Sequence, residues 1–429
     1  MNISDRRSGT IQTLAWYLLT ISLLTVATFS KAAEIVERTI LNSASIDSLL
    51  DETLDGKPLR TLITPVQERM IRDYGFEMTL IHRQEVFFDE SLIELTERYA
   101  DEVKLTENNR IEGYVAGMPF KEINIDDPRA AVKLAYNFLR APWMGQNVDY
   151  DPMYFLIIDG KKGLQRQQGW RFQRYMLEGQ KQNPHKEDSQ LSKYQSLFAQ
   201  YPQDIRGLGV LTVNYQNNRL PDVYAYVKQL RRVRRLSSGA WADPVASSDF
   251  LTDELFGLDS QPNWYEKWEL LEKRWMLTTV HGESFGLDEY EDNPELRYPK
   301  IKLNQPPHWN FEEVYEPREV WVVKTTMNEK HTYATRHYYF DAHLYTPMLP
   351  WQEAYNEKGE LEKVMVIGYQ SVPWEDGVSG VGAGIVSAID IKKMHATVLY
   401  NAPLDQYRIN NPYAVAKEFA PQSLSRRFK

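Results

Sequence analysis

Alternating apolar and polar positions run through residues 201–250, and this period-two pattern predicts β-strands. β-Branched and aromatic residues are concentrated in three short runs, at 209–215, 223–227 and 230–236. Turn-forming residues interrupt the alternation at 217–218 and again at 237–239. We therefore expect three antiparallel strands joined by turns, in a meander.

The third of these runs carries four arginines in five positions, Arg231–Arg235. Because a strand sends alternate side chains to opposite faces, Arg232 and Arg234 share one face and the other two arginines share the opposite face. One interpretation is a solvated edge strand whose charges discourage pairing with other edges. The other is a set of guanidiniums that bind carboxylates or an anionic head group. The candidates for this polar cluster are Asp204, Arg206, Arg232, Arg234 and Asp249.

The same alternation predicts strands at 154–158 and 169–177, followed by a second meander in the C-terminal third. The strands of this second meander are expected at 319–326, 333–341, 344–355 and 361–369. Trp170, Phe172 and Tyr175 do not all fall on one face of their strand, which requires a bulge or burial on both faces.

Helical periodicity is found mainly in the first third of the chain. It predicts helices at 64–74 and at 91–102, where apolar and acidic residues alternate at helical spacing. A third helix is predicted at 127–140, with an aspartate cap and Pro128 in its first turn. The spacing of apolar residues in 264–277 fits a helix in the first part of this segment and a strand in its last part.

The first 33 residues have the three parts of a secretory signal peptide. Arg6 and Arg7 are followed by a 16-residue apolar stretch and by the small-residue cleavage site at 30–32. That stretch is shorter than the roughly 20 residues of a membrane span, although an uncleaved anchor is the alternative. The chain has no cysteine, and therefore neither a disulfide nor a lipid-modified N-terminal cysteine. We expect a cleaved leader, a periplasmic location and one domain at 34–429, because no low-complexity linker divides the chain.

Composition narrows the function only slightly. The formal net charge of −9 argues against nucleic-acid binding. Aromatic residues make up 12% of the chain, with 26 tyrosines and 11 tryptophans. Such a content suits a large β-structure with an aromatic cavity or interface, and it also suits sugar-binding surfaces.

Several segments resemble the signature segments of a family of secreted bacterial proteins known as domain of unknown function 1329. They are Gly113–Phe120, Asp127–Ala131, Pro202–Gly207, Leu230–Leu236 and Ser247–Phe250. That family is similar to the outer-membrane lipoprotein-sorting proteins. The resemblance implies an α+β fold, in which a strongly curved antiparallel sheet forms an open or half barrel around a hydrophobic cavity and a few helices cover it. One departure is Val223-Tyr224, where a tryptophan is expected to open the strand.

The resemblance also implies a function, namely a carrier or chaperone for a lipid or other hydrophobic molecule. Such a carrier would work between inner-membrane export machinery and an outer-membrane protein. Aromatic residues on the predicted strands are candidates to line the cavity, with ordinary core packing as the competing interpretation of each. They are Trp170, Tyr175, Tyr224, Tyr226, Trp275 and Trp321.

Motifs for catalysis or cofactors are not evident. The sequence lacks a Gly-x-Ser-x-Gly elbow and a His-Glu-x-x-His motif, and the glycine-rich stretch 377–384 lacks the Lys-Ser/Thr ending of a phosphate loop. His331, His337 and His343 recur every six residues, but predicted turns separate them. We therefore expect no catalytic residue, metal or cofactor. The alternative is a carbohydrate-binding or glycoside-hydrolysing protein. Glycoside hydrolysis needs a pair of carboxylates, and among 59 acidic residues the sequence singles out no particular pair.

Overall fold

A computed structural model describes residues 32–182, 190–216, 219–227, 232–236, 242–282, 303–311, 313–328, 331–401, 407–419 and 423. The predicted signal peptide lies outside these residues, apart from its last two positions. Within the described ranges, no helix is long and apolar enough to cross a membrane.

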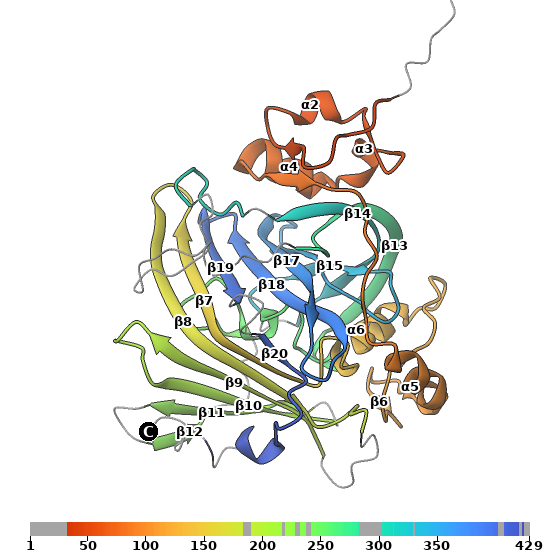
Figure 1. Ribbon diagram of the computed structural model, residues 1–429, viewed down its shortest axis with the longest axis vertical. Helices are drawn as coiled ribbons and strands as arrows, with labels where there is room; N and C mark the ends of the chain where they lie inside the picture. The colour runs from red at the N-terminus through yellow and green to blue at the C-terminus, as the bar shows by residue number, and fades with distance from the viewer. Residues whose placement is uncertain are drawn as a thin grey trace, which may run out of the picture.

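One large sheet dominates the structure and curves strongly around its inner side (Figure 1). Its path runs β1-β4-β14-β15-β16-β17-β18-β19-β7-β8-β9-β10-β11-β12, while β13 pairs with β14 and β20 with β7. Neighbouring strands are antiparallel, except that β4 and β14 are parallel. The sheet does not close, since β1 and β12 lie at opposite ends of the path. This confirms the predicted fold class, an open curved antiparallel sheet with a few helices.

The strands of the large sheet are mostly long. They are β1 (Ile40–Leu41), β4 (Met78–Leu80), β7 (Asn147–Asp159), β8 (Gly163–Met176), β9 (Leu191–Tyr201), β10 (Leu208–Tyr215), β11 (Asp222–Val227), β12 (Arg232–Arg235), β13 (Lys267–Thr278), β14 (Val314–Thr326), β15 (Thr335–Asp341), β16 (Trp351–Tyr355), β17 (Leu361–Pro373), β18 (Ser379–Asp390), β19 (His395–Asn401) and β20 (Tyr407–Ile409).

The remaining elements are short. The helices are α2 (Ile46–Leu49), α3 (Leu59–Leu62), α4 (Pro65–Tyr74), α5 (Ser91–Tyr99) and α6 (Ala130–Arg140). Two small hairpins pair β2 (Thr53–Leu54) with β3 (Lys57–Pro58) and β5 (Lys104–Leu105) with β6 (Ile111–Glu112). Single 3₁₀ turns include η4 (Thr252–Glu254), η5 (Pro262–Trp264) and η8 (Ala416–Phe419).

Both predicted meanders are present. Strands β10, β11 and β12 pair in order, as do β14 to β17. Only the end of the predicted strand 344–355 becomes β16, and 264–277 is strand after a single 3₁₀ turn. Of the two expectations for Trp170, Phe172 and Tyr175, burial on both faces of β8 is the one observed, since the register shift with β9 lies before Trp170.

Helix α4 follows its local sequence signals closely, whereas α6 departs from them at its start. Helix α4 begins with a capping box between Thr64 and Gln67, and Gly75 ends it in the left-handed conformation with a φ of 66°. Helix α6 starts later than predicted, at Ala130. Asp127 instead accepts a hydrogen bond from the backbone N–H of Arg129, in a turn before the helix.

The alternation along each strand separates two cores. On β14, Val323 packs on one face with α6, whereas Val320 and Val322 pack on the other with the N-terminal helices. We call the first the inner face and the second the outer face. Helices α2, α3 and α4 cover the outer face near β13 and β14 (Figure 1).

Helix α6 is enclosed rather than half-exposed. Ten of its residues are buried, including Asn137 and Arg140, which the helical pattern places among polar positions. The reason is the curvature of the sheet, which surrounds the helix with aromatic side chains of the inner face. The amphipathic pattern therefore understates the burial of this helix.

Candidate functional site

A cavity of about 520 Å³ lies between the inner face of β8–β11 and residues 243–264, which we call the strap. Its lining is largely apolar and comes from both sides. From the sheet come Trp170, Phe172, Leu197, Leu208, Val210, Val223 and Ala225, and from the strap Pro244, Val245, Ala246, Leu255 and Trp264.

Strand register aligns the apolar side chains of the sheet. Phe172 pairs with Leu197, Leu197 with Val210, and Val210 with Ala225. Directly paired residues on neighbouring strands present their side chains on the same face. These four residues therefore form one continuous apolar row across four strands, facing the strap.

Two aromatic contacts seat the strap on the sheet beside the cavity. The ring of Phe256 lies 4.7 Å from that of Phe172, and Phe250 lies 5.9 Å from Phe155. Both phenylalanines of the strap are buried. They attach the strap to the inner face of β7 and β8.

A buried ion network ties the strap to β15 and β17. Arg336 donates to Asp253 at 2.7 Å and to Glu254 at 2.9 Å, while Lys363 donates to Glu254 at 2.8 Å. All four side chains are at most 3% exposed, and two positive charges balance two negative ones. Because an unpaired buried charge is costly, the four groups depend on one another.

Burial shapes the ionisation of this network. Desolvation raises the pKa of Asp253, which also lines the cavity. For Glu254, desolvation is opposed by Lys363 and Arg336, which hold its pKa below the ordinary value. His331 lies beside the network, and burial lowers its pKa to about 3, so that it is neutral near neutral pH.

A second polar contact fixes the start of the strap. The carboxylate of Asp249 lies 2.7 Å from Nδ1 of His395 and accepts a hydrogen bond of 2.7 Å from Thr397. The hydrogen bond with Asp249 raises the pKa of His395. Both partners are on β19, so the strap is tied to the sheet at two separate places.

Charged groups at the rest of the cavity wall are mostly paired. Arg166, at the exposed side, donates to Asp204 at 2.6 Å. Asp259, at the other end, forms an ion pair with Lys193. Between them, Gln195, Thr212 and Asn214 add neutral polar groups to an otherwise apolar wall.

The predicted lining residues divide into two groups. Trp170 lines the cavity, and Trp321 lines a smaller one of about 100 Å³ beside α6. Tyr226 borders the cavity, but it alternates with Ala225, so its ring is directed to the outer face. Tyr175 and Tyr224 lie instead on the outer face, in the cluster that contains Phe419. Trp275 is also on the outer face, where Nζ of Lys57 lies 4.1 Å from its ring centre.

Strand parity explains why Tyr175 lies outside. The register shift in β8 comes before Trp170, and the pairing with β9 is continuous from there to Met176. Trp170 and Phe172 therefore share the inner face, whereas Tyr175 is directed to the outer face. A bulge between Phe172 and Tyr175 would have reversed this.

The predicted polar cluster is not assembled in the structure. Asp204 pairs with Arg166, and Asp249 pairs with His395. Arg206 is exposed, and Arg232 and Arg234 lie on the exposed edge strand β12. Sequence analysis missed the strap network, because single charges spread over distant strands carry no periodic signal.

The histidines that recur every six residues do not converge. His331 lies near Asp253, His337 lies near Glu353, and Nδ1 of His343 lies 2.8 Å from the hydroxyl of Thr346.

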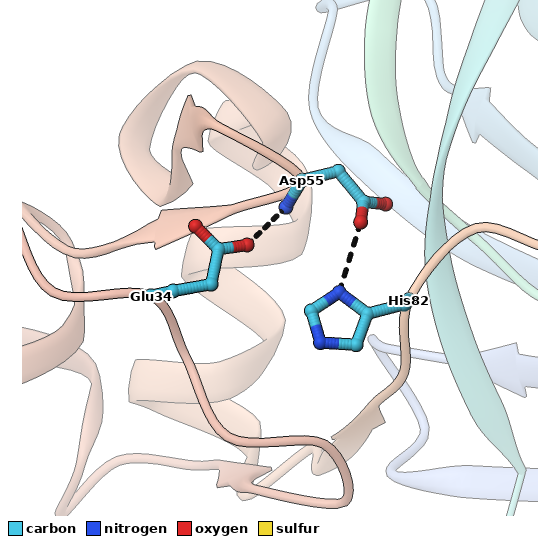
Figure 2. A group of neighbouring side chains, drawn as sticks. All are labelled: Glu34, Asp55 and His82. Carbon is cyan, nitrogen blue, oxygen red and sulfur yellow. Dashed lines mark hydrogen bonds and ion pairs between the residues drawn. The ribbon is translucent and has the colours of Figure 1, made fainter.

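A different trio brings ligand-type atoms within 4.8 Å of one another in the described part of the chain: Glu34, Asp55 and His82 (Figure 2). Its atoms already join three segments. Glu34 accepts from the backbone N–H of Asp55, and Asp55 lies 2.9 Å from Nδ1 of His82. The trio therefore has a structural explanation in the N-terminal region.

Comparison with solved structures finds distant similarity to several proteins, of which three are described below. A domain named as an outer membrane lipoprotein-sorting protein, from Vibrio parahaemolyticus, aligns at 15% identity and a TM-score of 0.43, over 66% of this chain and 92% of its own. A DUF1329 family protein from Desulfovibrio piger aligns at 13% identity and a TM-score of 0.42, over 65% of this chain and 92% of its own. A LolA superfamily protein from Nitrosomonas europaea aligns at 11% identity and a TM-score of 0.35, over 66% of this chain and 94% of its own.

A comparison with curated proteins found no match. The model of the family described as "Protein of unknown function (DUF1329)" matches residues 57–425, which is most of the chain. The protein therefore belongs to the DUF1329 family, as the sequence segments indicate.

Proposed function

We propose that the protein is a periplasmic carrier or chaperone that holds a lipid or other hydrophobic molecule in the cavity beneath the strap. The observation that supports this most directly is the apolar row Phe172, Leu197, Val210 and Ala225, which faces a cavity of about 520 Å³. Cavities of this size are typical of sites for small organic ligands.

Binding would be driven by removal of apolar surface from water. Burying each 100 Å² of apolar ligand surface stabilises a complex by about 2.5 kcal/mol. The wall suits an apolar chain because Asp253 and Asp259 are neutralised by Arg336 and Lys193. An apolar ligand would leave these ion pairs intact.

The proposed location rests on the N-terminal leader. A cleaved signal peptide would release the protein into the periplasm, where a hydrophobic cargo needs protection from water. The resemblance of the sequence segments to the outer-membrane lipoprotein-sorting proteins supports two partners, namely an inner-membrane exporter and an outer-membrane protein.

The test is to purify the protein from a periplasmic extract and to examine it by native mass spectrometry, followed by solvent extraction and lipid analysis. We expect a co-purified hydrophobic molecule, or uptake of a fluorescent fatty-acid probe by the emptied protein. A protein that carries nothing and takes up no probe contradicts the proposal.

A matched pair of variants assigns uptake to the cavity. Val210→Trp fills the cavity, whereas Val233→Trp places the same residue on the edge strand at a position that is 37% exposed. We expect the first to lower probe uptake at least tenfold and the second to leave uptake unchanged. Equal uptake by both, with unchanged melting temperatures, would place the ligand elsewhere.

A further inference from the structure

The edge strand β12 extends the cavity-facing side of the sheet by one more strand. Arg234 pairs directly with Ala225, and Arg232 pairs with Val227. Since Ala225 lines the cavity, the side chain of Arg234 starts on the same inner face. Arg232 lies two residues away on that face. The apolar row therefore ends in Arg234 at the open edge of the sheet, with Arg232 beside it on the same face.

Leu236 fixes how close these arginines are to the cavity. It follows β12 on the inner face, and its backbone N–H donates to Val223 at 2.8 Å. Leu236 lines the cavity and is also 43% exposed, so it lies at the boundary with solvent. Arg234 is its next neighbour on the same face, so it lies directly beside the lining of the cavity.

Among the described residues, Arg232 and Arg234 take part in no ion pair, although both are exposed on an acidic protein with a formal net charge of −9. Arg235 behaves differently. It is on the outer face and forms an ion pair with Asp222. The strand thus has one neutralised arginine outside and two available guanidiniums inside.

The other charges of the cavity wall do not replace this pair. Arg166 is occupied by Asp204, while Asp253 and Asp259 are held by Arg336 and Lys193. Asp243, at the exposed start of the strap, is the carboxylate of the wall without an ion pair in the described ranges. The two arginines outweigh it, so the mouth has a positive balance.

We propose that the cargo is an amphiphile whose apolar chain occupies the cavity and whose anionic head group, a carboxylate or a phosphate, binds Arg232 and Arg234. This inference rests on the proposed function and specifies its ligand class. Guanidiniums suit the role because they stay charged and present paired N–H donors to such groups. Binding of an anionic head group also explains why an edge strand beside an apolar cavity carries arginine at two inner positions.

The experiment compares four probes with a sixteen-carbon chain: hexadecanoate, hexadecyl phosphate, hexadecanol and hexadecyltrimethylammonium. Each displaces a bound fluorescent fatty acid from the full protein at low ionic strength. We expect the two anionic probes to bind roughly tenfold more tightly than the alcohol, since each exposed contact adds a modest amount. The preference should shrink as salt is added.

Paired variants test the residues. Arg232→Gln combined with Arg234→Gln should abolish the preference for anionic probes and leave the affinity for hexadecanol unchanged. Arg235→Gln removes the same charge from the outer face of the same strand and should keep the preference. A melting curve for each variant checks that the fold persists.

The outcomes separate the two proposals. If no probe binds, the carrier function itself fails. If all four bind equally to the unaltered protein, or if Arg235→Gln has the same effect as the double variant, the head-group assignment fails while the carrier function stands. If inorganic phosphate alone binds as tightly as hexadecyl phosphate, the arginines form a free-anion site and the amphiphile proposal is overturned.

Discussion

The two halves of the sheet have the same architecture but different interiors. In the half built from β13–β18, which we call the packed half, aromatic rings fill the inner face: Phe138 lies 5.8 Å from Phe340, and Trp143 lies 5.9 Å from Tyr369. In the half built from β8–β12, the cavity half, the strap leaves about 520 Å³ unfilled. The difference comes from what faces the sheet.

Helix α6 fills the packed half because a helix is wide, about 10 Å with its side chains, and ten of its residues are buried there. The strap is an irregular segment, and its anchors are the two phenylalanines and the ion pairs to Arg336, Lys363 and His395. A sheet that curves around a helix in one half can thus enclose a ligand cavity in the other half, where the thinner strap is attached to the sheet at a few fixed points.

The largest expected effect comes from breaking the strap network. Arg336→Met leaves the buried Asp253 and Glu254 with one cation between them, and we expect a loss of about 3–5 kcal/mol in the free energy of unfolding. Urea denaturation measures this. Arg98→Met, at an exposed pair with Glu94, is the control and should change stability by less than about 0.5 kcal/mol. A similar small effect for both variants would mean that the network does not hold the strap.

A second prediction compares the two interiors directly. Ile367 is fully buried on the inner face of the packed half, and Ile367→Ala should cost about 2–5 kcal/mol because it creates a new void. Val210 already faces unfilled space, so Val210→Ala should cost less than about 1 kcal/mol. Equal losses in urea denaturation would show that the cavity half is packed as tightly as the other.

The smallest effect concerns pH. Because Asp249 raises the pKa of His395 in the folded state, the pair stabilises the fold fully below the ordinary histidine pKa of about 6.5 and loses this contribution as pH rises through the raised value. The gain is about 0.5 kcal/mol, since solvent screens a partly exposed pair.

His395→Gln should therefore reduce stability at pH 6 and approach the unaltered protein at pH 9. Other histidines act in the opposite direction: burial lowers the pKa of His331 and His343, so both oppose folding only below pH 6.5. The difference between the two proteins, measured by denaturation at each pH, isolates His395. A difference that grows with pH would contradict the prediction.

Local sequence signals predicted much of the framework. The meander of β10–β12 follows from period-two alternation, and α4 from the Thr64-Pro65 opening. The site was harder to predict. Of the six aromatic candidates, Trp170 presents its ring to the cavity, because residue type alone does not reveal which face of a strand turns inward.

What the sequence determined by itself was therefore local: where strands and helices form, which residues share a face of one strand, and that Arg232 and Arg234 share such a face. Tertiary structure alone decided which face is inner. Both faces of most strands are buried, so the two sets of alternate residues are similarly hydrophobic and the sequence does not distinguish them. It also decided that distant charges at Asp253, Arg336 and Lys363 meet. Contacts between residues about 80 to 110 positions apart depend on the curvature and register of the whole sheet, and no local pattern records them.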